Sequence, residues 1–184
     1  MNFPPFPLSS EVVAEEVSRY QGLGSLPVSR EWAERAFSCI DLTTLNSTDT
    51  VSHVTAFTQK VNRFALDYPA IPPVAALCVY PNMAFLVKEI LAVEGVKVAA
   101  VAGGFPSSMT FAELKAEEAA MAVAQGADEI DMVIPLWAFL EGNYDQCRKE
   151  IRLVRQASGD AHLKVILESG LIGDPREIWK ASLL

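Results

Sequence analysis

Short apolar runs of β-strand composition alternate with helical patterns along most of the chain, and this alternation constrains the fold more than any other feature. The runs occupy residues 40–45, 74–80, 96–101, 129–135 and 163–168. Each interval between them holds one helical pattern, with apolar residues three or four positions apart. Repeated strand–helix units are typical of a parallel sheet with right-handed crossovers. The sequence therefore predicts an α/β fold.

The helical patterns have recognisable ends. We expect helices over 49–66, 82–93, 110–125 and 143–157, and a last one that starts at Asp174 and runs into the chain end at Leu184. Thr110 and Glu113 have the spacing of a capping box. Asp174 followed by Pro175 is typical of a helix start.

Residues 1–38 differ from the rest, because prolines near the start precede two short helical patterns. Ser10 can cap a helix over 11–20, and Ser29 can cap one that reaches Phe37. We expect this region to be an N-terminal helical extension, followed by a barrel-type unit over 39–184.

Two architectures fit the repeat: an open doubly wound sheet and a (β/α)₈ barrel. Residues 40–184 hold five units in 145 residues, about 29 residues each. Eight such units would need about 232 residues, near the roughly 250 of a complete barrel. The chain is therefore either a complete five-strand open sheet or five-eighths of a barrel.

Charged residues inside the strand patterns favour the barrel. Asp41, Asp131, Lys164 and Glu168 all fall within predicted strands, and alternation places Lys164 and Glu168 on one face. Helices cover both faces of a doubly wound sheet, so its strands are near-continuous apolar runs. Charges within strands fit a barrel whose interior opens to an active site.

Composition excludes several classes of protein. A net charge of −8 and a pI near 4.8 argue against binding to a nucleic-acid backbone, which requires a basic face. No apolar run is long enough to span a bilayer, and the start of the chain lacks the pattern of a signal peptide. Three cysteines without a Cys-x-x-Cys pair fit reduced thiols. We expect a cytoplasmic protein.

Asp131 and Lys164 are the first candidate functional pair, since they lie on consecutive parallel strands. A carboxylate beside an ammonium in a dry pocket can relay protons. The alternative is a structural buried ion pair. The segment from Asp41 to Asn46 ends the first strand, where barrel sites are built, although Asn46 or Asp49 could simply cap the next helix.

The remaining candidates are weaker. Cys78 lies near the same rim, but a lone cysteine in a strand is more often a small buried apolar residue. Gly103 and Gly104 could bind a phosphate, although without a P-loop lysine a tight turn fits them better. His53 and His162 lack the spacing of a metal site, so no metal is expected.

Five ordered motifs resemble the deoxyribose-phosphate aldolase family. They read Ile-Asp-Leu-Thr-Thr-Leu at 40–45, Ala-Leu-Cys-Val-Tyr-Pro at 76–81, Gly-Phe-Pro at 104–106, Gly-Ala-Asp-Glu-Ile-Asp-Met-Val at 126–133 and Leu-Lys-Val-Ile-Leu-Glu-Ser-Gly at 163–170. The resemblance covers roughly residues 39–184. It implies a TIM barrel and reversible cleavage of 2-deoxy-D-ribose 5-phosphate to glyceraldehyde 3-phosphate and acetaldehyde.

The resemblance also implies the roles of the residues. A lysine on strand six forms the Schiff base, no metal or other cofactor takes part, and a lysine on strand seven lowers the pKa of the first. Asp131 matches the aspartate that relays protons. Asp41, Asn46, Cys78 and Lys164 match positions that line the pocket in supporting roles.

The chain departs from the family after its fifth unit. The Lys-Thr-Ser-Thr-Gly motif that carries the Schiff-base lysine and the later phosphate-binding loops do not occur in the 184 residues. We therefore expect an incomplete barrel that is inactive alone and whose open strand edges favour association or strand exchange. The chain is either a fragment of a longer enzyme, which the intact motifs favour, or a natural truncation that has lost the chemistry. The alternative is a non-enzymatic five-strand module that binds a small anion or a partner chain.

Overall fold

One parallel sheet organises the computed structural model, which describes residues 3–24 and 27–184. Its strands are β1 (Asp41–Thr43), β2 (Ala76–Val79), β3 (Lys97–Ala102), β4 (Glu129–Val133) and β5 (His162–Ile166), in the spatial order β1-β2-β3-β4-β5. A doubly wound sheet reverses this order at a switch point. The sequential order is that of a barrel wall, so the α/β prediction is confirmed, and the described strands form an incomplete barrel.

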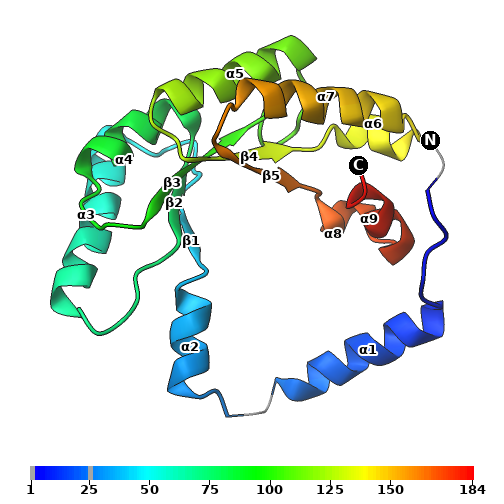
Figure 1. The fold of residues 1–184 in the computed structure, drawn as a ribbon, viewed down its shortest axis with the longest axis horizontal. Helices are drawn as coiled ribbons and strands as arrows, with labels where there is room; N and C mark the ends of the chain where they lie inside the picture. Colours follow the sequence, from blue (N-terminus) through cyan, green and yellow to red (C-terminus); the bar gives the residue numbers. More distant parts are fainter. Residues whose placement is uncertain (1–2, 25–26) are drawn as a thin grey trace.

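Helices cover one face of this sheet. The helices that follow the strands are α3 (Val51–Asp67), the 3₁₀ turn η1 (Pro81–Met83) with α4 (Ala84–Ile90), α5 (Ala112–Ala124), α6 (Leu136–Leu140), α7 (Tyr144–Ala157), α8 (Ser169–Ile172) and α9 (Pro175–Ala181). In Figure 1, α3, α4, α5 and α7 lie on the outer side of the curved sheet. Within residues 3–24 and 27–184, no helical layer packs on the inner side of the sheet.

The main core lies between the strands and these helices. Leu77, Val98 and Ile130 point outward from the sheet and pack with Val54 and Val154 of the helices, all nearly inaccessible to solvent. The inner face carries smaller buried side chains, which are Ala76, Cys78, Ala99 and Val101. Small residues there leave room for the long polar side chains of the neighbouring strands.

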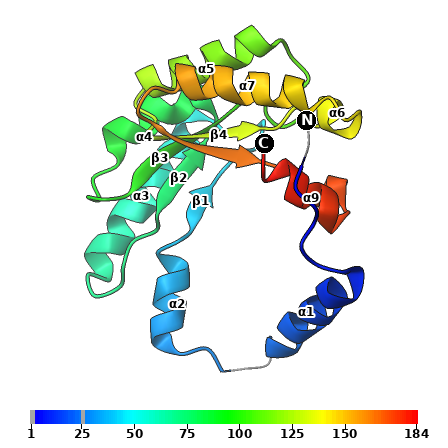
Figure 2. The same cartoon turned by 45° about the vertical axis from the view of Figure 1, so that its right-hand side comes forward.

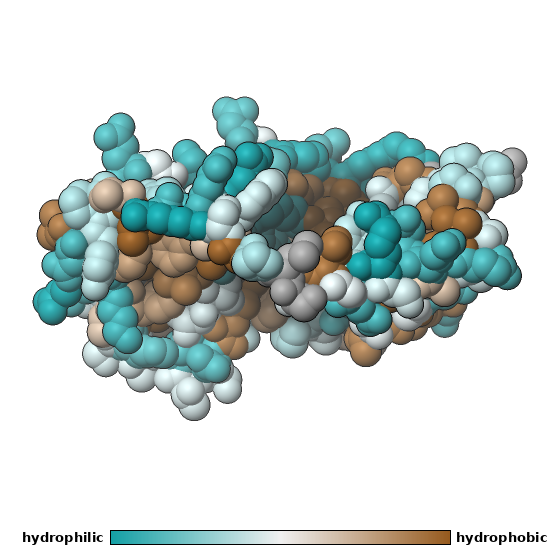
Figure 3. Space-filling view, turned by 90° about the horizontal axis from the view of Figure 1, so that it is seen from below, coloured by the Kyte–Doolittle hydropathy of each residue, from teal (hydrophilic) through white to brown (hydrophobic). Residues whose placement is uncertain are grey.

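The N-terminal extension crosses below the sheet. Helices α1 (Ser10–Leu23) and α2 (Arg30–Phe37) lie away from the sheet layer, and α2 leads into β1 (Figure 2). The segment before α1 packs on the other end of the chain, where the rings of Phe6 and Trp179 lie 5.8 Å apart. Seen from below, the surface is hollowed near its middle, with hydrophobic side chains beside the hollow (Figure 3).

Several helix starts were predicted correctly. Ser29 accepts a hydrogen bond from the amide of Trp32, and Asn143 accepts one from Gln146. Asp174 caps α9, as predicted. The short helices α6 and α8 were not predicted, because neither is long enough to show a helical period.

Four details of the prediction were wrong. Ser9, not Ser10, caps α1. The N-cap of α5 is Phe111, without a side-chain hydrogen bond, so Thr110 forms no capping box. Glu168 is not in a strand: β5 ends at Ile166, and Glu168 adopts a φ of 55° at the start of α8. Helix α9 ends at Ala181 rather than at the end of the chain.

Candidate active site

Three carboxylates surround one ammonium on the inner face of the sheet. Alternation along β4 turns Glu129 and Asp131 to the same side, and register pairs Asp131 with Lys164 on β5. Lys164 Nζ donates to Asp41 Oδ2 and lies 2.9 Å from Glu129 Oε2 and 3.1 Å from Asp131 Oδ1. The candidate pair Asp131 and Lys164 is therefore in direct contact, and Asp41 joins it from β1.

Cys78 completes the cluster from β2. Its thiol donates to Asp131 Oδ2 over 3.7 Å, and the side chain is buried. Burial, together with the nearby Asp131 carboxylate, raises the pKa of Cys78 to about 12. The group is therefore a neutral thiol near pH 7 and a poor nucleophile.

The protonation of Lys164 is set by its neighbours. Burial alone would lower its pKa, but the hydrogen bonds to Asp41, Glu129 and Asp131 outweigh burial and raise the pKa well above its usual value of 10.5. Lys164 is thus held as an ammonium. A protonated amine does not attack a carbonyl, so the geometry makes Lys164 a fixed positive charge rather than a nucleophile.

The pKa of Asp131 is raised, although an ammonium beside a carboxylate usually lowers its pKa. Burial raises its pKa, the Lys164 contact acts to lower it, and the Asp41 carboxylate raises it again, so the pKa lies above the usual range. Two other carboxylates share the same ammonium, which is why Lys164 does not reverse the effect of burial. Asp131 Oδ1 is inaccessible to solvent and, apart from its 3.1 Å ion-pair contact with Lys164 Nζ, has no hydrogen-bond partner within residues 3–24 and 27–184. Such a carboxyl group is suited to taking up and releasing a proton.

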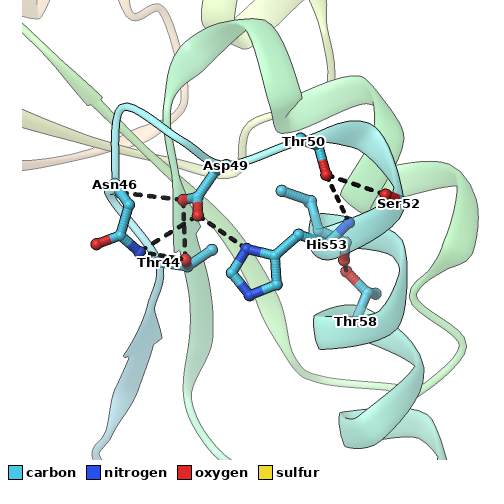
Figure 4. A network of polar contacts seen from close by, with 8 residues as sticks. Thr44, Asn46, Asp49, Thr50, Ser52, His53 and Thr58 are labelled. Atoms are coloured by element: carbon cyan, nitrogen blue, oxygen red, sulfur yellow. Dashed lines mark hydrogen bonds and ion pairs between the residues drawn. The ribbon is translucent and has the colours of Figure 1, made fainter.

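Asn46 lies in a separate network at the rim, in the loop between β1 and α3 (Figure 4). The Asp49 carboxylate accepts hydrogen bonds from Thr44 Oγ1 at 2.8 Å, from the Asn46 amide at 3.1 Å and from Asn46 Nδ2 at 3.3 Å. His53 Nδ1 lies 2.9 Å from the same carboxylate. Burial of Asp49 acts to raise its pKa, but these hydrogen bonds lower it. The structure thus places Asn46 apart from the inner cluster, and Thr50 rather than Asn46 or Asp49 caps α3.

The loop with Gly103 and Gly104 forms a tight turn. The Gly104 amide donates to Glu118 Oε2 at 2.9 Å, so this amide already has an anionic partner within the protein. A Cβ on Gly104 would lie 2.7 Å from Thr110 Cγ2, and its φ is 72°. Local packing and backbone geometry therefore account for this glycine.

Sequence reasoning missed Glu129. It is the first residue of β4, where a charged side chain is usually solvated, but the alternation that was applied to Asp131 also turns Glu129 inward. Among the residues that the structure describes, no three His, Cys, Asp or Glu side chains are arranged to hold a metal ion. Within the same residues, no helix is long and apolar enough to cross a membrane.

Comparison with known proteins shows which family this sheet and its inner face belong to. Residues 35–180 match the family described as DeoC/LacD family aldolase. The chain belongs to this family. The match includes all five strands and every residue of the inner cluster, so the cluster is part of an aldolase barrel.

Individual relatives agree with this family. The chain is 36% identical over 173 residues to the deoxyribose-phosphate aldolase of Bos taurus, covering 86% of this chain and 54% of that protein. It is 35% identical to the Homo sapiens deoxyribose-phosphate aldolase, covering 83% of this chain and 51% of that protein. The chain therefore spans about half the length of these relatives.

A solved structure shows the same fold. The tetrameric deoxyribose phosphate aldolase of Aeropyrum pernix superposes with a TM-score of 0.61 at 26% identity, covering 96% of this chain and 68% of the other. The agreement extends over nearly the whole chain. The five strands described above thus correspond to part of the wall of a complete aldolase barrel.

Proposed function

We propose that this chain forms part of an aldolase that reversibly cleaves 2-deoxy-D-ribose 5-phosphate to glyceraldehyde 3-phosphate and acetaldehyde through a lysine Schiff base. The observation that carries the proposal is the contact of Asp131 with Lys164 on the inner face of a family barrel. Relatives named deoxyribose-phosphate aldolase supply the substrate class.

Each residue of the cluster has a distinct role in this reaction. Cleavage of the carbon–carbon bond moves a proton between the sugar hydroxyl and the protein, and Asp131, with its raised pKa, is the group that takes and returns it. Lys164 supplies a fixed positive charge beside Asp131. Asp41 and Cys78 line the pocket, and Asn46 supports the rim through the loop that Asp49 organises.

The Schiff-base lysine is not Lys164, because three carboxylates keep its amine protonated. We assign that role to the lysine on the sixth strand of the family barrel. It follows that the 184-residue chain by itself is expected to show no retro-aldol turnover.

Borohydride trapping tests this assignment. The chain is incubated with acetaldehyde and sodium borohydride, and the product is analysed by intact mass and peptide mapping. We expect no stoichiometric adduct at Lys164. An adduct at Lys164 together with turnover would overturn the assignment, since the chain would then be a self-sufficient aldolase.

The role of Asp131 is tested in the full-length enzyme. Asp131→Asn is expected to lower kcat by about 10²-fold or more, the scale of a lost general acid–base group. Asp67→Asn, at the exposed end of α3, is the matched control and should leave kcat unchanged. Equal activity of the two variants would contradict the proton-relay role.

A non-enzymatic module that binds a small anion is not favoured. The inner cluster has three carboxylates and one ammonium, so it repels an anion unless a carboxyl group is protonated. We further propose a cytoplasmic enzyme of deoxyribose phosphate catabolism that forms homo-oligomers. The cysteine thiols are free, as in a reducing compartment, and the Aeropyrum pernix relative is a tetramer.

A further inference from the structure

Glu129 has no part in the proposed reaction, yet it is one of the nearest neighbours of Lys164. Its Oε2 atom lies 2.9 Å from Lys164 Nζ, nearer than the 3.1 Å of Asp131 Oδ1. The Glu129 side chain is 20% exposed and that of Lys164 is 31% exposed, so the contact is partly shielded from water. Because the Glu129–Lys164 pair is partly buried, it serves a purpose other than making the surface soluble.

The groups that surround the Lys164 ammonium are mostly carboxylates. The groups that face its ammonium are Asp41 from β1, Cys78 from β2, and Glu129 with Asp131 from β4. On the same face, β3 contributes Ala99 and Val101, and alternation also turns the exposed Lys97 to this face at the start of the strand. His162 on β5 is exposed and pairs in register with Glu129. Asp41 and Glu129 are thus the carboxylates that remain when Asp131 is protonated.

A lysine needs such partners to stay in one place. Its four-carbon stem is flexible, and its ammonium is a compact charge that can turn toward any nearby acceptor. If Asp131 were its main partner, each protonation of Asp131 would weaken the attraction that holds Lys164. Two further carboxylates, which contact Lys164 from other positions of the wall, reduce this dependence.

We propose that Glu129 is a positioning residue, which together with Asp41 holds the Lys164 ammonium beside Asp131 while Asp131 takes up and gives up a proton. The inference rests on the proton-relay role of Asp131 proposed above. Glu129 acts through Lys164 and does not itself contact the reacting molecule.

The test follows the Lys164 ammonium by ¹⁵N NMR in the 184-residue chain, with Asp131→Asn as a mimic of protonated Asp131. In the Asp131→Asn variant, Lys164 should keep a protected ammonium signal. In the Asp131→Asn/Glu129→Gln double variant, the signal should broaden through exchange and the pKa of Lys164 should fall by about one pH unit. Glu94→Gln, in an exposed loop, replaces Glu129→Gln in the matched control and should leave the Asp131→Asn signal unchanged.

Equal Lys164 signals in the single and double variants would overturn the proposal. If the double variant does not fold, the chain with Asp131 unchanged still decides the matter. There a Glu129→Gln single substitution should broaden the Lys164 Nζ signal through exchange, and an unchanged signal would overturn the proposal. Neither measurement requires turnover, so failure here is distinguishable from failure of the borohydride or Asp131→Asn activity tests.

Discussion

At the scale of single residues, the most completely buried charges lie outside the candidate site. Lys115 on α5 is 0% exposed and Glu150 on α7 is 2% exposed, with Nζ and Oε2 2.5 Å apart. Lys115 Nζ also donates to Ser108 Oγ, and Gln146 Nε2 donates to Glu150 Oε1. Loss of one partner leaves the other charge buried, so Lys115→Met is expected to lower the free energy of unfolding by about 3–5 kcal/mol, measured by urea denaturation.

The control variants distinguish the ion pair from ordinary packing. Lys149→Met, on the exposed side of α7, should change the free energy of unfolding by less than about 0.5 kcal/mol. The double variant Lys115→Met/Glu150→Leu removes both charges and should be more stable than Lys115→Met alone. A double variant as unstable as the single one would show that the charges do not depend on each other.

The same residues show how far sequence reasoning reaches. Asp41, Cys78, Asp131 and Lys164 could be assigned to one face because alternation along a strand needs only sequence. Lys115 and Glu150 could not, because a charged residue on an amphipathic helix is usually solvated, and their burial depends on how closely α5 packs on α7. Long-range contacts of this kind have no local signal.

At the scale of elements, side-chain caps define the helix starts. Thr50 Oγ1 accepts a hydrogen bond of 3.2 Å from the backbone amide of His53. This bond caps the start of the 17-residue helix α3. Thr50→Ala should therefore lower the free energy of unfolding by about 1 kcal/mol in thermal or urea denaturation. Thr48→Ala, in the same loop but exposed and outside the cap, should have no measurable effect. Equal losses for the two variants would mean that the loop, not the cap, determines stability.

Strands were predicted more reliably than helix starts. All five strand patterns contain strands, because short apolar runs that alternate with helical patterns are a strong signal in a repeated unit. The cap at Thr110 failed because the loop before α5 continues to Phe111, which starts the helix without a side-chain hydrogen bond. Cap residues show where a helix can begin, but the preceding loop decides which one is used.

At the scale of the whole molecule, the segment from Phe3 to Ser10 lies against α7 and α9 on one side of an incomplete barrel wall. The N-terminal segment runs past α9 and α7 in both ribbon views (Figures 1 and 2). Phe3 packs edge-on against Tyr144 at 4.8 Å, Phe6 against Trp179 at 5.8 Å, and Arg176 donates to Ser10 Oγ at 2.9 Å. These contacts connect the extension that precedes β1 with the helices that flank β5, so they couple the two ends of the sheet.

This coupling predicts how local stability is distributed. An edge-to-face aromatic pair contributes about 1 kcal/mol beyond its buried area, so Phe6→Ala should let α9 open more often. Because amide exchange reports such local opening, the α9 amides should exchange roughly fivefold faster in hydrogen–deuterium exchange. Phe85→Ala, at an exposed site of α4 across the sheet, is the control and should leave these rates unchanged. Equal rates in the two variants would show that α9 is held by its own side of the wall and not by the extension.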